Sequence, residues 1–135
     1  MPRSLLKDPK VYLWDWAVLD NPGIRNENMV ACHLLKAVHS WQDLGLGEYS
    51  LFFLRTKDKK EVDFLVTKEA KPWFLVEVKS SWDASLSKNL SYFQEITGAK
   101  HAFQVVVDAD YSAVDCFDAT RPVKVAAINF LSQLV

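Results

Sequence analysis

The sequence has little of what marks exported or membrane proteins. It contains two cysteines, Cys32 and Cys116, and its first residues lack the continuous apolar stretch of a signal peptide, so a disulfide framework is not expected. No apolar run approaches the roughly 20 residues that cross a bilayer. These absences predict a protein of the reducing cytoplasm that does not enter a membrane.

The sequence also lacks an excess of charge of either sign. Its 16 Lys and Arg residues nearly balance 17 Asp and Glu residues, which leaves a net charge of −1 and excludes a generally cationic nucleic-acid binder. Basic residues nevertheless concentrate between Arg55 and Lys71. Such a stretch can be a local phosphate-binding face, although a solvated hairpin is the simpler interpretation.

Hydrophobic patterns predict one α/β domain over residues 1–135, half of whose residues are apolar. An aromatic segment at 10–20 reads as a short strand. An amphipathic helix is expected over 24–41, with Asn26 as its N-cap, because apolar residues recur there at helical spacing.

Three strand patterns separated by short polar turns then predict an antiparallel meander. A second helix over 86–100 leads into a strand over 102–108, and a final strand and helix are expected within 123–135. A strand reached through a helix normally runs parallel to its predecessor, so the sheet should be mixed and covered by helices.

Two of the predicted strands carry charged side chains among apolar ones. Asp63 lies within E-V-D-F-L-V, and Glu77 and Lys79 lie within L-V-E-V-K. Side chains at positions i and i+2 of a strand share one face, so Glu77 and Lys79 should stand side by side. The same alternation predicts that Val62 and Phe64 share the face opposite to that of Asp63.

Asp63 and Glu77 can reach a common point if the register allows, because neighbouring strands lie about 4.8 Å apart. Two converging carboxylates repel each other unless a cation lies between them, and hard oxygen ligands favour Mg²⁺ or Mn²⁺. Lys79 could then hold an attacking water or stabilise charge on a phosphate. Glu27, early in the first helix, is a fourth candidate, although the helix dipole alone can explain an acid there.

The arrangement of Asp63, Glu77, Val78 and Lys79 resembles the PD-(D/E)XK nuclease superfamily, with Glu27 upstream where many members carry an additional acid. The resemblance implies a restriction-endonuclease-like mixed sheet with an αβββαβ core flanked by helices. It further implies that Asp63, Glu77 and the carbonyl of Val78 hold Mg²⁺ or Mn²⁺. Lys79 would position the water and Glu27 would assist.

A resemblance that covers nearly the whole chain rests on four segments in order, K-V-Y-L-W-D-W-A-V-L-D, G-I-R-N-E-N-M-V-A-C-H-L-L, E-V-D-F-L-V and F-L-V-E-V-K-S-S. Together they are similar to an uncharacterised C-terminal domain of bacterial and archaeal AAA-type ATPases. The sequence has no G-x-x-x-x-G-K-[ST] phosphate loop, so these residues are not the ATPase itself. The chain is a stand-alone relative or the C-terminal fragment of a longer ATPase, and the fragment is expected because M-P-R-S-L-L-K-D-P-K resembles the linker before this domain.

Two hypotheses about function follow. The first is a nuclease-fold domain that binds DNA and hydrolyses phosphodiesters with Mg²⁺, next to an N-terminal ATPase domain. The second is a non-catalytic module of that ATPase, for nucleic-acid binding, regulation or assembly. Trp82, directly after E-V-K-S-S, is the best of the five tryptophans for stacking on a base. Gln94 on the second helix could face the acids, and a glutamine on the helix surface is an equally good interpretation.

Overall fold

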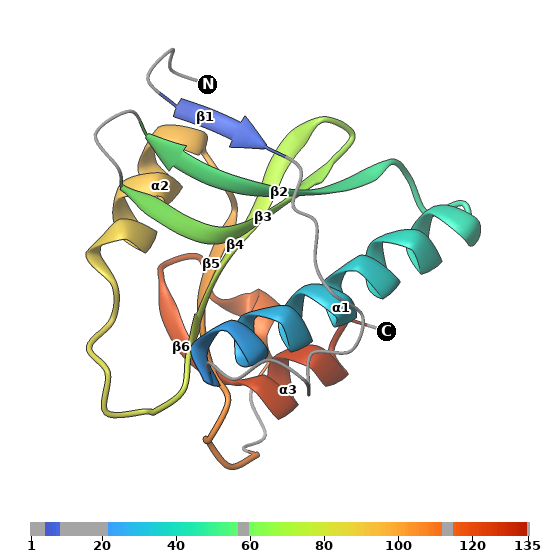
Figure 1. Cartoon of the computed structure of the whole chain (residues 1–135). Helices are drawn as coiled ribbons and strands as arrows, with labels where there is room; N and C mark the ends of the chain where they lie inside the picture. The colour runs from blue at the N-terminus through green and yellow to red at the C-terminus, as the bar shows by residue number, and fades with distance from the viewer. Residues whose placement is uncertain (1–4, 9–21, 57–59, 112–114, 135) are drawn as a thin grey trace.

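The computed structural model describes residues 5–8, 22–56, 60–111 and 115–134 (Figure 1). Its elements are β1 (Leu5–Asp8), α1 (Pro22–Asp43), β2 (Tyr49–Thr56), β3 (Glu61–Lys68), β4 (Lys71–Lys79), α2 (Lys88–Thr97), β5 (His101–Val106), the short 3₁₀ helix η2 (Cys116–Asp118), β6 (Val123–Ala126) and α3 (Ala127–Ser132). The predicted order of helix, three strands, helix and strand is confirmed. The segment at 10–20 lies outside the described residues.

The strands form one six-stranded sheet in the order of the sequence, from β1 to β6. Strands β1 to β4 are antiparallel, whereas β4, β5 and β6 run parallel to one another. The sheet is therefore mixed, as the sequence predicts. The edge strand β1, by contrast, has no counterpart in the prediction.

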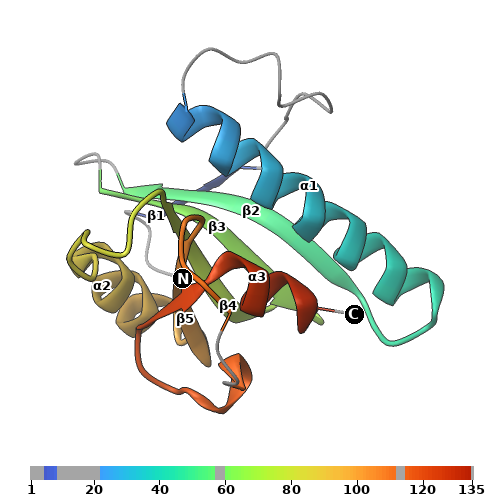
Figure 2. The same ribbon diagram turned by 90° about the horizontal axis from the view of Figure 1, so that it is seen from below.

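Helices cover both faces of the sheet, with α1 and α3 on one face and α2 on the other (Figures 1 and 2). The core beneath α1 and α3 contains Val30, Leu34, Val38, Phe64, Val66, Phe74, Val76, Phe103 and Phe130. The core beneath α2 contains Leu54, Val62, Leu65, Leu75, Leu90, Phe93 and Ala102. Each fully buried Leu or Phe contributes about 1.5–3 kcal/mol. None of the described helices is long and apolar enough to cross a membrane.

Helix α1 begins before the predicted cap. Its first residue is Pro22, and proline is favoured there because its ring fixes a helical φ and its missing N–H has no helical partner. The expectation that Asn26 caps this helix is therefore wrong. The Asn26 amide instead donates a hydrogen bond of 2.9 Å to the hydroxyl of Ser80, which ties the start of α1 to the end of β4.

Helix α2 is shorter than predicted, and both of its ends are capped. The Ser87 hydroxyl accepts from the backbone N–H of Asn89, and Gly98 ends the helix in the left-handed region with φ of 74°. That conformation favours glycine, and the Gly98 N–H donates to the carbonyl of Gln94. The cap at Ser87 fixes where the chain that leaves β4 enters α2.

Strand β3 contains an irregularity at the predicted acid. The pairs with β2 on either side of it are Phe52–Leu65 and Leu54–Val62. Asp63 and Phe64 together therefore oppose the single residue Phe53, which is the arrangement of a β-bulge. A bulge interrupts strict alternation and re-aims the side chains that it contains.

The bulge overturns the prediction that Val62 and Phe64 share one face of the sheet. Val62 packs in the core beneath α2, whereas Phe64 packs in the core beneath α1 and α3. One extra residue in β3 makes this possible, since a one-residue register shift moves the following side chains to the other face. Both large apolar side chains are thus buried, and Asp63 lies between them in the sequence at the point of the kink.

Candidate active site

Asp63 bridges β3 and β4 with its side chain. Regular pairing between the two strands begins at Phe64 and Val76. Beyond that pair, Oδ2 of Asp63 accepts a hydrogen bond of 2.8 Å from the backbone N–H of Val78. A carboxylate that accepts from a backbone N–H is fixed in position, because the bond is charge-assisted. Asp63 is thereby held against the strand that carries Glu77 and Lys79.

Glu77 forms a side-chain hydrogen bond with Asp63. Burial raises the pKa of Glu77 to about 9, with further upward contributions from the charge of Asp63, from their hydrogen bond and from the charge of Glu27. The ammonium of Lys79 acts in the opposite direction and lowers this pKa. Near pH 7 the raised pKa keeps Glu77 mostly protonated, so that its carboxyl group can donate the hydrogen bond to Asp63.

The structure brings Asp63, Glu77 and Lys79 together and leaves Glu27 farther off, near enough for its charge to act on Glu77. Asp63, Glu77, Lys79 and Glu27 are all half-buried, and the charges of the other three act on Glu77. Glu27 comes from α1, on the helical turn whose Asn26 is bonded to the end of β4. The site is thus assembled from β3, β4 and the first turns of α1.

Val78 also faces this site with its backbone. The N–H and the carbonyl of a strand residue point to the same side of the strand. Because the Val78 N–H points to Asp63, the Val78 carbonyl lies on the side of β3 as well, and the next carbonyl, of Lys79, accepts from Val107 of the neighbouring chain segment. The carbonyl predicted as a metal ligand therefore has the right direction.

The oxygen atoms of Asp63, Glu77 and the Val78 carbonyl are of the kind that hard divalent cations prefer as ligands. Within the described residues, no three or more His, Cys, Asp or Glu side chains are grouped so as to hold a metal ion. Mg²⁺ commonly takes one or two carboxylates and keeps several waters, so the pair of Asp63 and Glu77 with the Val78 carbonyl is a sufficient protein contribution. A cation that binds both carboxyl groups would displace the proton from Glu77, because metal ligands bind in their deprotonated form.

Gln104 is a residue near the site that the sequence analysis missed. It is fully buried in β5, where it pairs in register with Glu77. Its Oε1 accepts from the backbone N–H of Ser87 at 2.8 Å, and its Nε2 donates to the carbonyl of Ser85 at 3.0 Å. These bonds fix the segment between β4 and α2. The signal was available, since Gln104 is the single amide within the apolar run A-F-Q-V-V-V.

Gln94, the glutamine that the sequence analysis did consider, does not face the acids. Its Nε2 donates to the carbonyls of Ala99 and Thr120, at 3.2 and 2.8 Å. These contacts join α2 to the segment before β6. Of the two placements open to Gln94 from the sequence, the one that faces the acidic pair is therefore wrong.

Comparison with protein families adds one finding to this geometry. Residues 23–124 match the family described as "Domain of unknown function (DUF4143)". The chain belongs to the DUF4143 family. Comparisons with curated proteins and with solved structures gave no significant match. The matched range of this DUF4143 domain contains Glu27, Asp63, Glu77 and Lys79, so the whole candidate site lies within the family region.

Proposed function

We propose that this DUF4143 domain is a restriction-endonuclease-like domain of the PD-(D/E)XK superfamily that binds DNA and hydrolyses phosphodiesters with Mg²⁺ or Mn²⁺. The observation that carries the proposal is the hydrogen-bonded pair of Asp63 and Glu77 beside Lys79, with Asp63 fixed by the Val78 N–H. Two carboxyl groups that meet in this way offer the hard oxygen ligands that a divalent cation takes.

Each residue has a distinct role in this proposal. Asp63, Glu77 and the Val78 carbonyl would hold the metal, which when bound neutralises phosphate charge and activates water. The hydrogen bond from Val78 fixes the carboxylate of Asp63. Lys79 holds the attacking water or the charge that develops on the phosphate, and Glu27 assists from α1.

The proposal extends to the setting of the domain. The four sequence segments shared with C-terminal domains of AAA-type ATPases support an N-terminal ATPase domain as partner in a longer chain. The domain would then act on DNA in the cytoplasm.

A non-catalytic module is the alternative, and one observation favours it. Because Glu77 keeps a proton, the pair of Asp63 and Glu77 needs no cation to relieve its repulsion. The same residues could then join β3 to β4 in a domain for regulation, assembly or nucleic-acid binding.

Calorimetric titration of MnCl₂ into the purified domain distinguishes the nuclease from the non-catalytic module. Wild type should bind Mn²⁺ above pH 7, and Asp63→Asn and Glu77→Gln should lose binding because each removes a ligand charge. Lys79→Ala is the matched variant, since it keeps both acids and should still bind the ion.

Cleavage of single-stranded, duplex and branched DNA with Mg²⁺ or Mn²⁺ is then compared across the same proteins. We expect cleavage by wild type and its loss in all three variants, Lys79→Ala included. A folded wild type that binds no Mn²⁺ at millimolar concentration and pH 8 would establish the non-catalytic alternative.

A further inference from the structure

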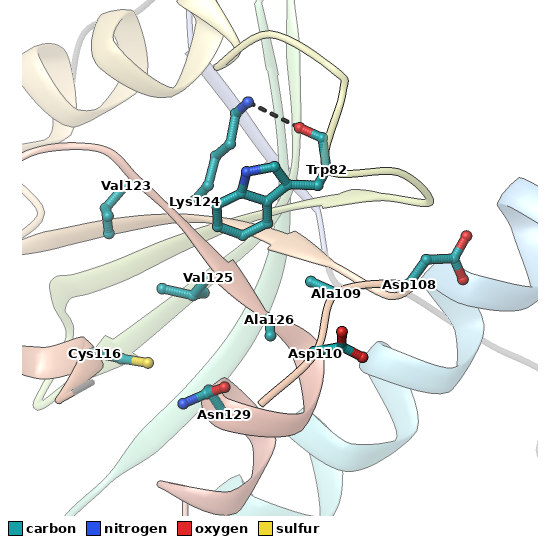
Figure 3. Close-up of a pocket in the computed structure, with 10 residues that line it drawn as sticks. All are labelled: Trp82, Asp108, Ala109, Asp110, Cys116, Val123, Lys124, Val125, Ala126 and Asn129. Carbon is teal, nitrogen blue, oxygen red and sulfur yellow. Dashed lines mark hydrogen bonds between the residues drawn. The ribbon is translucent and has the colours of Figure 1, made fainter. Parts of the chain in front are cut away.

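A pocket of about 580 Å³ lies along β6, the edge strand of the parallel half of the sheet (Figure 3). Its walls come from the segment after β4, the segment after β5, and β6 with the start of α3. Val125 and Ala126 are among the apolar side chains that line it, and Trp82, Lys124, Asp108 and Asp110 supply its aromatic and charged groups. Pockets of this size accept small organic groups.

Backbone hydrogen bonds join the pocket directly to the strand that carries Glu77 and Lys79. The N–H of Val107 donates to the carbonyl of Lys79 at 2.9 Å, and the N–H of Asp108 donates to the carbonyl of Ser80 at 3.1 Å. Asp108 lines the pocket. These bonds fix the start of the segment after β5, which lines the pocket, against the end of β4.

The indole of Trp82 is half exposed, and hydrogen bonds fix the backbone at Trp82 and at the residues that follow it. Lys124 donates from Nζ to the Trp82 carbonyl at 3.0 Å, and the same Nζ lies 5.7 Å from the ring centroid (Figure 3). Gln104 fixes the chain a few residues later, at Ser85 and Ser87. An exposed indole fixed at the mouth of an apolar pocket is a surface on which a planar ring can stack.

The charges around Trp82 define which planar group fits. Asp108 and Asp110 are exposed carboxylates across the pocket from Lys124 (Figure 3), and they disfavour a phosphate while accepting hydrogen bonds from N–H groups. The Lys124 ammonium already lies by the indole, which disfavours a cationic ligand at the ring. A neutral heteroaromatic ring with amino or imino groups fits these charges, because its N–H groups can donate to Asp108 or Asp110 and its uncharged ring can stack beside Lys124.

We propose that this pocket receives an unpaired nucleobase of a bound DNA strand, stacked on Trp82 and hydrogen-bonded to Asp108 or Asp110. The inference rests on the proposed function for the identity of that strand. Base binding in the pocket requires neither metal nor the acidic pair, so the proposed nuclease activity and the proposed base pocket can be disproved separately.

Free nucleosides test the pocket without phosphate or metal. Cytidine and adenosine are titrated to millimolar concentration into ¹⁵N-labelled domain, and the indole N–H signal of Trp82 is identified by its loss in Trp82→Phe. We expect it to shift saturably in wild type and equally in Glu77→Gln. In Trp82→Ala, nucleoside binding detected by calorimetry should be lost. Leu46→Ala, which removes another exposed apolar side chain, is the control.

Single-stranded DNA gives the second readout. Stacking of one base on an aromatic side chain predicts that Trp82→Ala weakens binding of a short single strand about tenfold, and that Trp82→Phe retains most of the affinity. Duplex binding should change much less, because paired bases cannot enter the pocket.

Three results would overturn the inference. One is a Trp82 signal that does not shift with nucleosides in a folded domain. Another is a shift caused by arginine amide but not by nucleosides, which would make the pocket a cation site. The third is equal loss of single-strand affinity in Trp82→Ala and Leu46→Ala. Nucleoside binding without DNA cleavage would overturn the proposed nuclease activity and leave the pocket standing.

Discussion

The carboxylate of Asp63 accepts a hydrogen bond of 2.8 Å from the backbone N–H of Val78, the residue between Glu77 and Lys79. This single bond joins the acid of β3 to the E-x-K sequence of β4. Val78 lies beyond the last paired residues of β3 and β4, and the Asp63 carboxylate accepts the hydrogen bond from its backbone N–H. The two strands can therefore separate here without leaving this N–H unsatisfied. The opening between them is where the two acids meet.

The first prediction concerns pH and Glu77. The pKa of Glu77 is about 9 in the folded state and 4.5 in an exposed side chain, so the folded state binds more protons between these two pH values. The stabilisation is complete below about pH 4.5 and is lost as the pH rises through 9. Denaturant unfolding of the metal-free domain should show stability falling from pH 5 to pH 9. Glu77→Gln should flatten this fall, and an unchanged slope in the variant would contradict the assigned proton.

The second prediction follows from the same proton and rests on the proposed metal site. A cation that binds Asp63 and Glu77 must displace the proton, so Mn²⁺ affinity should rise up to about tenfold per pH unit below pH 9. Calorimetry in two buffers of different ionisation enthalpy measures the protons released. Close to one proton per ion is expected at pH 7. Binding with no proton release would place the ion elsewhere.

The third prediction separates packing from chemistry on β4. Leu75 and Val76 are fully buried, so Leu75→Ala and Val76→Ala should each lower the free energy of unfolding by about 1–4 kcal/mol. Lys79→Ala should change it little, since Lys79 is half-buried and stands beside the acidic pair. Urea unfolding of the three variants checks the order. If Lys79→Ala is the least stable, the site is a structural ion pair.

The fourth prediction compares the two glutamines. Gln104→Leu leaves the N–H of Ser87 and the carbonyl of Ser85 without their partner in a buried place, at about 1–3 kcal/mol for each group. Gln94→Leu is the matched control, because its amide is less buried and water can replace it. Hydrogen exchange should accelerate at the Ser87 amide in Gln104→Leu alone. Equal destabilisation by the two changes would contradict the positioning role of Gln104.

Some of the fold follows from local sequence patterns. Apolar spacing in α1 and in the strands of the meander reports burial directly, because a helix and a strand each present one periodic set of side chains to the core. The adjacency of Glu77 and Lys79 is equally local, since residues two apart in a strand share a face. The parallel course of β5 follows from the helix that precedes it.

Tertiary structure decided the rest. The bulge at Asp63 depends on the register between β3 and β2, and no pattern within β3 contains that register. The raised pKa of Glu77 comes from burial and from charges on β3 and α1 that are distant in sequence. Gln104 likewise acts through partners 17 and 19 residues away. The sequence by itself determined which residues carry charge and which strands hold them. Only packing determined that Glu77 keeps its proton beside Asp63, because desolvation and proximity are properties of the folded chain.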